Sequence, residues 1–322
     1  MSLAALLSVV LLVSLSASLA PASLSSTAIV GEIISQVDEQ NLKTHICYWQ
    51  SQEGGESCNP LGSRWSCLPT AIDRALDYGR RYFESVGLRV RVDNYSLACR
   101  AGPSSNLEAE LPGTESTKLV LITAHLDSTI FGVSPSQPTP GADDNASGSA
   151  AVLEAARILS QYRFKHTIRF VLFTGEEQGL IGSRAYASRL ASQGAQILGV
   201  FNMDMIGYDS DKDGVFEIHA GTREGPLALA QLMVNTLKAF EIKLTPDVLE
   251  NGATNRSDHA AFWRYNYPAV LVIEDSEYGK TDDFNPYYHS VNDTLDKLDL
   301  SYAKRIAQAV IGAAAQLAEP TP

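Results

Sequence analysis

The sequence contains little cysteine, and none of it lies in the last two thirds of the chain. The four cysteines among 322 residues are Cys47, Cys58, Cys67 and Cys99. Their spacings match no zinc knuckle and no histidine pair accompanies them, so a cysteine metal site is the poorer interpretation. An even number of clustered cysteines in an exported chain suggests two disulfides, although four cysteines allow three pairings. We expect these disulfides to fasten an N-terminal segment.

Positive charge is also scarce. Lys and Arg number 25 against 37 Asp and Glu, which gives a formal net charge of −12. Because such a surface repels a polyanion on average, we expect no nucleic-acid partner. The middle of the chain has no Pro/Ser-rich or charged linker, and we find no internal repeat. With 45% hydrophobic residues, the composition excludes a disordered chain and favours one catalytic domain.

A single long run of apolar and small residues covers residues 3–20. The small-x-small pattern of residues 20–22 follows it, as at signal-peptidase sites, although no Lys or Arg precedes the run. The run is short for a membrane span, and an uncleaved anchor is the alternative. We expect a signal peptide over 1–22, an N-terminal helix and cysteine-bearing loop segment over 23–68 and a catalytic domain over 69–322, with 23–322 as one structural unit. The mature protein is then secreted, extracellular or periplasmic, and free of the membrane.

Short apolar, β-branched runs alternate with helical patterns along the chain. The runs predict buried strands over residues 120–124, 168–174, 198–203 and 269–274. Apolar spacing predicts helices over residues 24–38, 69–86, 147–161, 226–240 and 301–317, the last capped by Thr294 or Asp299, whereas 41–66 suggests an irregular loop. The predicted fold class is therefore α/β, a single globular domain with a central, mostly parallel mixed sheet flanked by helices on both faces.

Side chains that can bind metals follow the ends of three predicted strands. They are His125 and Asp127 after the first strand, Glu176 and Glu177 after the second, and Asp204 after the third. Because the carboxyl ends of parallel strands form the ligand crevice of an open α/β sheet, we expect these groups to converge. A lone Glu-Glu pair is usually solvated surface, but its place after a buried strand favours a functional role.

Two further candidates lie on loops. Asp144 belongs to GADDNASG (141–148), where a carboxylate would stand by the positive end of a helix, and a capped loop without a ligand explains it equally well. His289 belongs to PYYHSVNDT (286–294), and taken alone such a histidine is more often structural. Asp258 and His259 are candidates for an outer layer of the site or for a substrate wall.

Several weaker patterns complete the set of candidates. DSDKDG (209–214) has the alternate Asp spacing of a calcium loop, but Ala220 stands where an EF-hand needs Glu, so we expect a hairpin turn between strands 201–208 and 215–219. Tyr265 or Tyr267 could bind an oxyanion. Aromatic residues that line the substrate pocket or pack in the core are Phe262, Trp263, Tyr278 and Phe284.

Five motifs in one order then carry a family resemblance. They are AHLDS (124–128), GADDNASG (141–148), TGEEQGLIGS (174–183), NMDMIGY (202–208) and YHSVNDT (288–294). Together they resemble the bacterial leucyl aminopeptidase family of co-catalytic zinc exopeptidases, whose relatives include glutamate carboxypeptidase II and glutaminyl cyclase. The resemblance covers about residues 70–315 and rests on motif order and spacing. The cysteine-bearing segment lies outside it.

The resemblance implies a zinc exopeptidase fold, two zinc ions per chain and a role for each motif residue. His125 and Asp204 would hold one zinc, Glu177 and His289 the other, and Asp144 would bridge them. Glu176 would be the general base, and Asp127 would accept a hydrogen bond from His125 and orient it. Nitrogen and oxygen ligands suit zinc and would also accept Co²⁺ or Mn²⁺.

The implied activity is that of an aminopeptidase, a hydrolase whose partners are the N-termini of peptides or proteins, acting as a monomer. A carboxypeptidase or dipeptidase of the same family would share every ligand, although no large inserted domain is present here. A glutaminyl cyclase typically works with one zinc, and a non-catalytic receptor-like module would lack a ligand. All five ligands are present, which favours the aminopeptidase.

Overall fold

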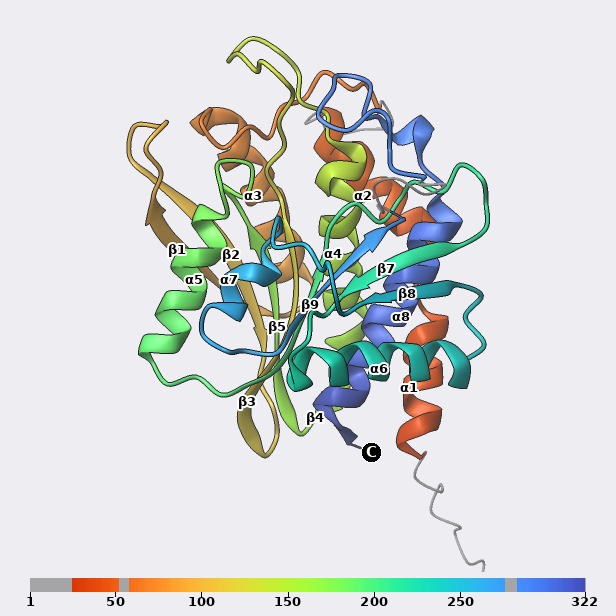
Figure 1. Ribbon diagram of the computed structural model, residues 1–322. Coiled ribbons are helices and arrows are strands. Elements are labelled where there is room, and N and C mark those ends of the chain that lie inside the picture. Colours follow the sequence, from red (N-terminus) through yellow and green to blue (C-terminus); the bar gives the residue numbers. More distant parts are fainter. Residues whose placement is uncertain (1–24, 52–57, 276–282, 322) are drawn as a thin grey trace, which may run out of the picture.

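One eight-stranded sheet organises the chain (Figure 1), which the computed structural model describes over residues 25–51, 58–275 and 283–321. In spatial order the strands are β1 (Arg89–Ser96), β2 (Pro103–Leu111), β5 (His166–Phe173), β3 (Ser116–His125), β6 (Ile197–Met203), β9 (Ala269–Glu274), β7 (Val215–His219) and β8 (Thr245–Leu249). The central pairs β5–β3, β3–β6 and β6–β9 are parallel, whereas β1–β2, β2–β5 and β7–β9 are antiparallel. The predicted fold class is therefore confirmed.

The four strands predicted from apolar runs are the central ones, β3, β5, β6 and β9. Side chains of β3 alternate between two cores: Val120 and Ile122 face one, and Leu119 and Leu121 face the other. A strand buried on both faces has no polar side, which explains why its sequence is a continuous apolar run. The flanking strands β1, β2 and β8 include polar or partly exposed positions, and the sequence did not predict them.

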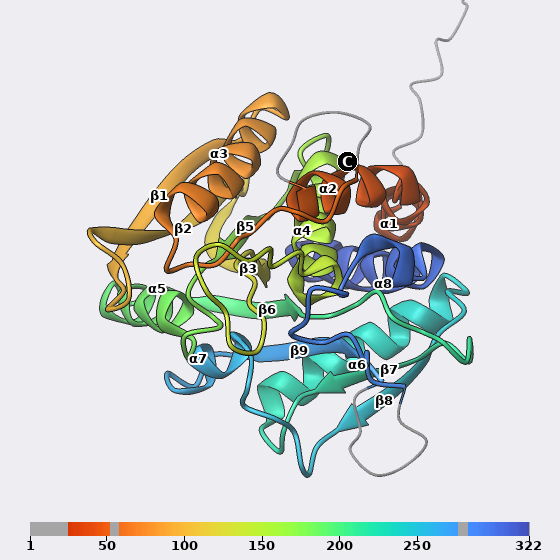
Figure 2. The same ribbon diagram turned by 90° about the horizontal axis from the view of Figure 1, so that it is seen from above.

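Helices cover both faces of the sheet (Figure 2). One face is covered by α3 (Pro69–Ser85), α4 (Gly148–Leu159), α6 (Glu224–Ala239) and α8 (Leu300–Ala318), and α1 (Ser26–Ser35) and α2 (Glu39–Ser51) pack on the outside of α4 and α8. The other packs against α5 (Ile181–Ser192) and α7 (His259–Trp263), neither of which was predicted. Two short strands, β4 (Arg163–Phe164) and β10 (Pro320–Thr321), pair separately. Asp299, rather than Thr294, caps α8 by accepting a hydrogen bond from Tyr302 N.

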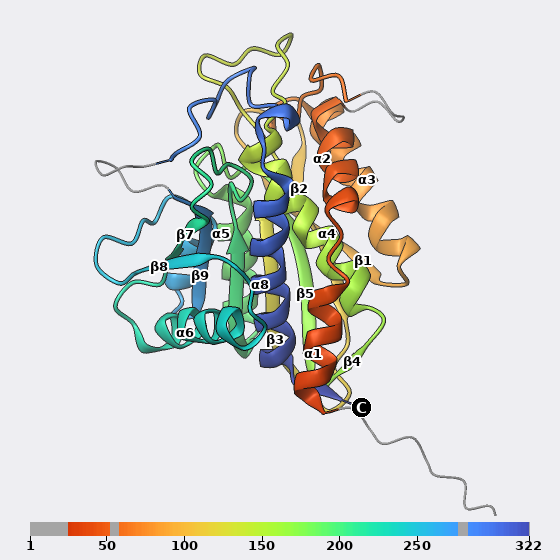
Figure 3. The ribbon, with the colours of Figure 1, turned by 90° about the vertical axis from the view of Figure 1, so that its right-hand side faces the viewer.

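The N-terminal part differs from the prediction. The expected helix over 24–38 ends at Ser35, and α2 occupies the first part of the expected irregular loop over 41–66. Leu42, Ile46 and Trp49 of α2 are almost wholly buried, since their helical spacing turns one stripe toward the core beside α4 and α8 (Figure 3). The polar residues between them hid this stripe in the sequence.

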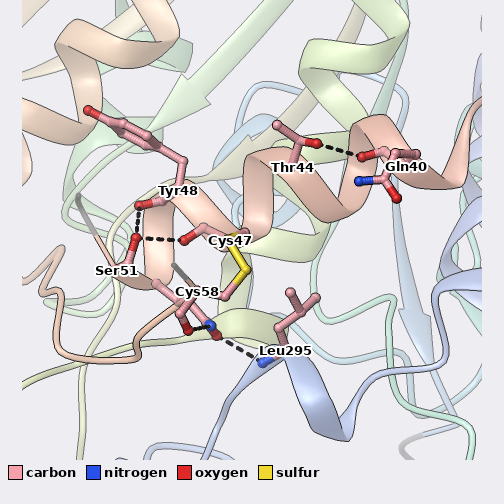
Figure 4. Close-up of a disulfide and its surroundings, with 8 residues drawn as sticks. Gln40, Thr44, Cys47, Tyr48, Ser51, Cys58 and Leu295 are labelled. Carbon is pink, nitrogen blue, oxygen red and sulfur yellow. Dashed lines mark hydrogen bonds between the residues drawn. A yellow bond between two sulfur atoms is a disulfide. The ribbon is translucent and has the colours of Figure 1, made fainter. Parts of the chain in front are cut away.

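Two disulfides, Cys47–Cys58 and Cys67–Cys99, select one of the three possible pairings. Figure 4 shows the first, which joins α2 to the chain that follows it. The expected signal peptide, residues 1–22, lies outside the described residues. Within the described residues, no helix is both long and apolar enough to cross a membrane.

The predicted hairpin around DSDKDG is wrong. The strand β7 pairs with β8 and β9, and β9 lies between β6 and β7 in the sheet. The chain therefore passes from β6 to β7 without pairing the two strands, because β9, which comes later in the sequence, lies between them. No local sequence pattern indicates this order. Asp209 and Asp211 instead approach Asp283, which is distant in sequence.

Candidate metal centre

Three adjacent strands deliver polar side chains to one edge of the sheet. His125 is the last residue of β3, Glu176 and Glu177 follow β5, and Asp204 follows β6. The turn after β5 depends on Gly175, whose φ is +70° and where a Cβ would lie 2.5 Å from Tyr95 Oη. A side chain at this position would both strain the backbone and collide with the tyrosine.

A kinked segment, Ala142–Ser147, brings Asp144 to the same edge just before α4. Both carboxylate oxygens of Asp293 accept backbone hydrogen bonds there, from Asp143 N at 2.9 Å and Asp144 N at 3.0 Å. Asn145 Oδ1 accepts from Gly148 N at 2.9 Å, at the start of α4. Capping is therefore performed by Asn145, and the carboxylate of Asp144 remains available for the site.

The predicted ligand atoms gather in two groups that share Asp144. His125 Nε2 lies 3.2 Å from Asp144 Oδ1 and 3.1 Å from Asp204 Oδ1. His289 Nε2 lies 3.1 Å from Asp144 Oδ2 and 3.0 Å from Glu177 Oε2. Each oxygen of Asp144 thus faces a different imidazole, as a carboxylate between two cations would.

The donor set fits zinc. Two ligands of one tetrahedral zinc, each about 2.0 Å from the ion, lie about 3.3 Å apart, close to the separations found here. His125 Nδ1 lies 3.0 Å from the carbonyl oxygen of Asp127, to which it can donate, so Nε2 is left as a lone-pair donor toward the carboxylates. Among the described residues, the buried Glu177 Oε1 accepts no hydrogen bond. A metal cation between these groups would satisfy their facing lone pairs.

Burial and mutual repulsion shift the acidities of these groups. Burial, together with the negative charge of Asp144, raises the pKa of Glu177 to about 7. Burial also raises the pKa of Glu176, and the charges of Glu177, Asp258 and Asp204 add to this effect. For Asp144 burial acts in the same direction, but hydrogen bonds with His125 and His289 outweigh it and lower its pKa.

Asp127 occupies a different place from the one expected. Its Oδ1 lies 3.7 Å from His125 Nδ1, which instead contacts the Asp127 backbone carbonyl. The carboxylate accepts from the backbone N–H groups of Glu176 at 3.3 Å and Glu177 at 3.4 Å, and from the Ser66 hydroxyl. The carboxylate of Asp127 therefore fixes the turn that carries the two glutamates, and its backbone carbonyl holds the imidazole of His125.

The segment that includes Asp258 and His259 lies behind the ligands. Ser257 Oγ donates to Asp204 Oδ2 at 2.6 Å, so the neighbouring serine supports a predicted ligand. His259 Nε2 contacts Thr254 O at 2.9 Å, and burial lowers the pKa of His259 to about 3, which keeps the ring neutral. Neither Asp258 nor His259 lines the cavity, so the substrate-wall alternative is wrong for both.

A cavity of about 670 Å³ opens beside the ligand atoms, and Glu176 lines it. Part of its wall is apolar and comprises Met205, Leu271, Ile273, Phe284 and Tyr288. A polar part, which the sequence did not indicate, comprises Glu217, His219, Asn251, Thr254, Asn255 and Arg256. The residues before Asp258 could have been predicted to lie near the site, because Asp258 and His259 were already candidates.

Most of the aromatic candidates lie elsewhere. Phe284 lines the cavity, whereas Phe262 packs in the core beside α5 and Trp263 packs against it. Tyr265 and Tyr267 do not line the cavity, and Tyr267 Oη donates to Ala195 O at 3.1 Å, so the oxyanion hypothesis is wrong for both. Tyr278 lies outside the described residues.

An α/β sheet with histidines and carboxylates gathered at its carboxyl edge, beside a cavity, defines a metal-dependent hydrolase. A model of peptidase family M28 matches residues 106–314, and the chain belongs to this family. The predicted resemblance to the zinc exopeptidases is thereby confirmed.

Three relatives illustrate the family. "Leucine aminopeptidase 1" of Paracoccidioides brasiliensis is 27% identical, over 92% of this chain and 76% of its own length. BSAP, a zinc aminopeptidase of Bacillus subtilis, is 25% identical with a TM-score of 0.57, over 67% of this chain and 50% of its own. A glutaminyl cyclase of Bacteroides thetaiotaomicron is 19% identical with a TM-score of 0.70, over 87% and 98% of the two chains, and shows the shared fold alone.

Proposed function

We propose that this chain is a zinc aminopeptidase that binds two zinc ions and removes the N-terminal residue of peptides. The observation that carries the two-ion proposal is the position of Asp144, with one oxygen against His125 and the other against His289. His125 and Asp204 would hold one zinc, Glu177 and His289 the other, and Asp144 would bridge them. Zinc bound there polarises a peptide carbonyl and acidifies water.

The chain's own residues then perform the proton transfers. Glu176 lines the cavity beside the ligand groups without belonging to the pairs of contacts around Asp144. Its carboxylate takes a proton from the attacking water and delivers it to the amine that leaves. Asp127 holds the backbone of Glu176 in place while this happens.

Charge and wall composition favour an aminopeptidase that accepts an apolar first residue. Glu176 lines the cavity and would bind no zinc, so its carboxylate can attract a substrate α-ammonium, whereas the charges of Glu177 and Asp204 would be balanced by the zinc ions. The apolar wall around Leu271 and Ile273 suits an aliphatic side chain. The relatives named leucine aminopeptidases are consistent with this choice.

We propose further that the enzyme is secreted, with residues 1–22 removed, residues 23–68 forming the cysteine-bearing segment and 69–322 the catalytic domain. Support for secretion comes from the two disulfides, which persist in oxidising compartments. The monomeric state and the ability of Co²⁺ or Mn²⁺ to replace zinc stay predictions.

A substrate panel tests the activity. We expect hydrolysis of leucyl p-nitroanilide, no hydrolysis of its N-acetyl form, no release of the C-terminal residue from an N-blocked dipeptide and no cyclisation of an N-terminal glutaminyl peptide. Chelation should abolish hydrolysis and added zinc should restore it, with two zinc ions per chain by elemental analysis. Release of a C-terminal residue would indicate a carboxypeptidase or dipeptidase instead of an aminopeptidase. Cyclisation without hydrolysis would indicate a glutaminyl cyclase.

A further inference from the structure

The residues that follow the first disulfide contact the backbone segments that carry the predicted metal ligands. We call residues 58–68 the strap. It is fastened at both ends, by Cys58 to α2 and by Cys67 to Cys99, between β1 and β2. The strap precedes residues 106–314, the part matched by the family model, and holds none of the predicted ligands.

Arg64 lies in the strap and is fully buried, and within the described residues the hydrogen bonds that its guanidinium donates all go to backbone carbonyls. Its Nε donates to Leu126 O at 2.7 Å, directly after the predicted ligand His125. Its Nη1 donates to Pro140 O at 2.6 Å and Trp49 O at 3.2 Å, and its Nη2 to Gly141 O at 2.7 Å. One guanidinium therefore joins the chain after His125 to the chain that leads into Asp144.

The fit around Arg64 is close. A Cβ at Gly141 would lie 2.9 Å from Arg64 Nη2 and 2.3 Å from Asp144 O, and the φ of Gly141 is +51°. Lysine could not replace this arrangement, because an ammonium lacks the planar fork that reaches several carbonyls at once. The positive charge of Arg64 also faces the carboxylates of Asp293, Asp144, Asp127 and Glu177, although burial lowers its pKa to about 10.

Ser66, two residues further along the strap, contacts the other half of the site. Its hydroxyl accepts from Gly175 N at 2.9 Å and donates to the carboxylate of Asp127. The same carboxylate holds the backbone of Glu176 and Glu177. Ser66 therefore supports the turn after β5, as Arg64 supports the segments around His125 and Asp144.

We propose that Arg64 and Ser66 are positioning residues of the metal centre and that the strap, through these two residues, holds the active site in its geometry. The two residues touch no predicted ligand atom and act by fixing the backbone on which the ligands stand. This inference rests on the proposed zinc site. It assigns a role to the cysteine-bearing segment that the family resemblance leaves open.

Zinc affinity and the visible spectrum of the Co²⁺-loaded protein test the proposal. Arg64→Met should weaken zinc binding by about 10-fold to 100-fold, as removal of ligand-orienting partners does elsewhere, and should shift or broaden the Co²⁺ bands. Arg64→Lys should recover little of the affinity. Ser66→Ala should lower kcat more than it raises KM, because it loosens the turn that carries Glu176.

Two matched controls separate positioning from stability. Arg157 also fastens the N-terminal segment, through Nη2 to Gln36 O at 2.7 Å, but contacts none of the predicted ligands. Arg157→Met should lower the Tm of the metal-free protein without changing zinc affinity or the Co²⁺ bands. Thr44→Ala removes a hydroxyl that donates to Gln40 O on α2 and contacts no predicted ligand among the described residues, so it should change none of these readouts.

If Arg64→Met and Ser66→Ala both keep wild-type zinc affinity, Co²⁺ bands and kcat, the strap is merely structural and the inference is wrong. If Arg64→Met fails to fold, the results for Ser66→Ala test the inference by themselves. A wild-type protein that binds no zinc would instead overturn the proposed function, so the two failures are distinguishable.

Discussion

Two adjacent glutamates serve different ends at this site. Glu177 Oε2 lies 3.0 Å from His289 Nε2, whereas Glu176 belongs to neither of the two ligand groups that share Asp144. Residues that directly follow a strand end project in different directions, so one carboxylate can bind metal while its neighbour faces the substrate cavity. The carboxylate of Asp127 accepts a hydrogen bond from the backbone N–H of each glutamate, and this holds the two side chains in their different directions.

Glu176→Gln should leave zinc bound and remove most turnover. The amide keeps the size of the side chain but cannot accept a proton, so we expect kcat to fall by about 10²-fold to 10⁴-fold. The measurements are kcat and zinc content per chain. Glu177→Gln is the matched comparison and should lose zinc, and a Glu176→Gln enzyme with near-normal kcat would exclude the general-base role.

At the scale of secondary-structure elements, α2 contains a buried histidine, His45. The His45 ring packs against Trp49, Tyr78 and Tyr82, and its Nδ1 lies 2.7 Å from Tyr78 Oη. Burial, aided by the positive charge of Arg157, lowers the pKa of His45 to about 3. The folded protein thus keeps this ring neutral at pH values where an unfolded chain protonates it.

The stability of the protein should therefore decline in mild acid. Because the folded pKa is depressed, the contribution of His45 is complete above pH 6.5 and is lost as the pH falls from 6.5 toward 3. One such proton contributes a slope of up to about 1.4 kcal/mol per pH unit. His45→Gln should make the slope shallower in urea unfolding of the metal-free protein between pH 7 and 4. Parallel slopes in wild type and variant would contradict this assignment.

Across the whole molecule, negative charge is concentrated where the predicted cations bind. The chain carries a formal net charge of −12, and Asp144, Glu176, Glu177 and Asp204 line one cavity. Without a cation these carboxylates repel one another, and the negative charge of Asp144 adds to the effect of burial in raising the pKa of Glu177. Metal binding and folding are therefore coupled.

Zinc should raise the Tm of the protein in a concentration-dependent way. A ligand at 100 times its Kd stabilises the state it binds by about 2.7 kcal/mol, which calorimetry with and without chelator detects. Asp144→Ala is the control and should show a much smaller shift, because both ligand groups share this residue. Identical melting curves with zinc and with chelator would argue against a zinc site in the folded protein.

The central sheet and the residues of the candidate site could be predicted from the amino-acid sequence. Strands buried on both faces are continuous apolar runs, so β3, β5, β6 and β9 were recognisable, and their ends pointed to His125, Glu177 and Asp204. Motif order added Asp144 and His289 and led to the family, which the match over residues 106–314 bears out.

The groups that surround those residues could not be predicted from the sequence and are seen in the tertiary structure. The contacts of Arg64 with Leu126 and Gly141 span 62 and 77 positions, and the chain between them leaves no periodic trace of the pairing. The same holds for the carboxylate of Asp127, which holds the glutamate turn instead of the imidazole. Local patterns report which side of an element is buried, whereas the partner of a buried polar group depends on which distant segment the fold brings beside it.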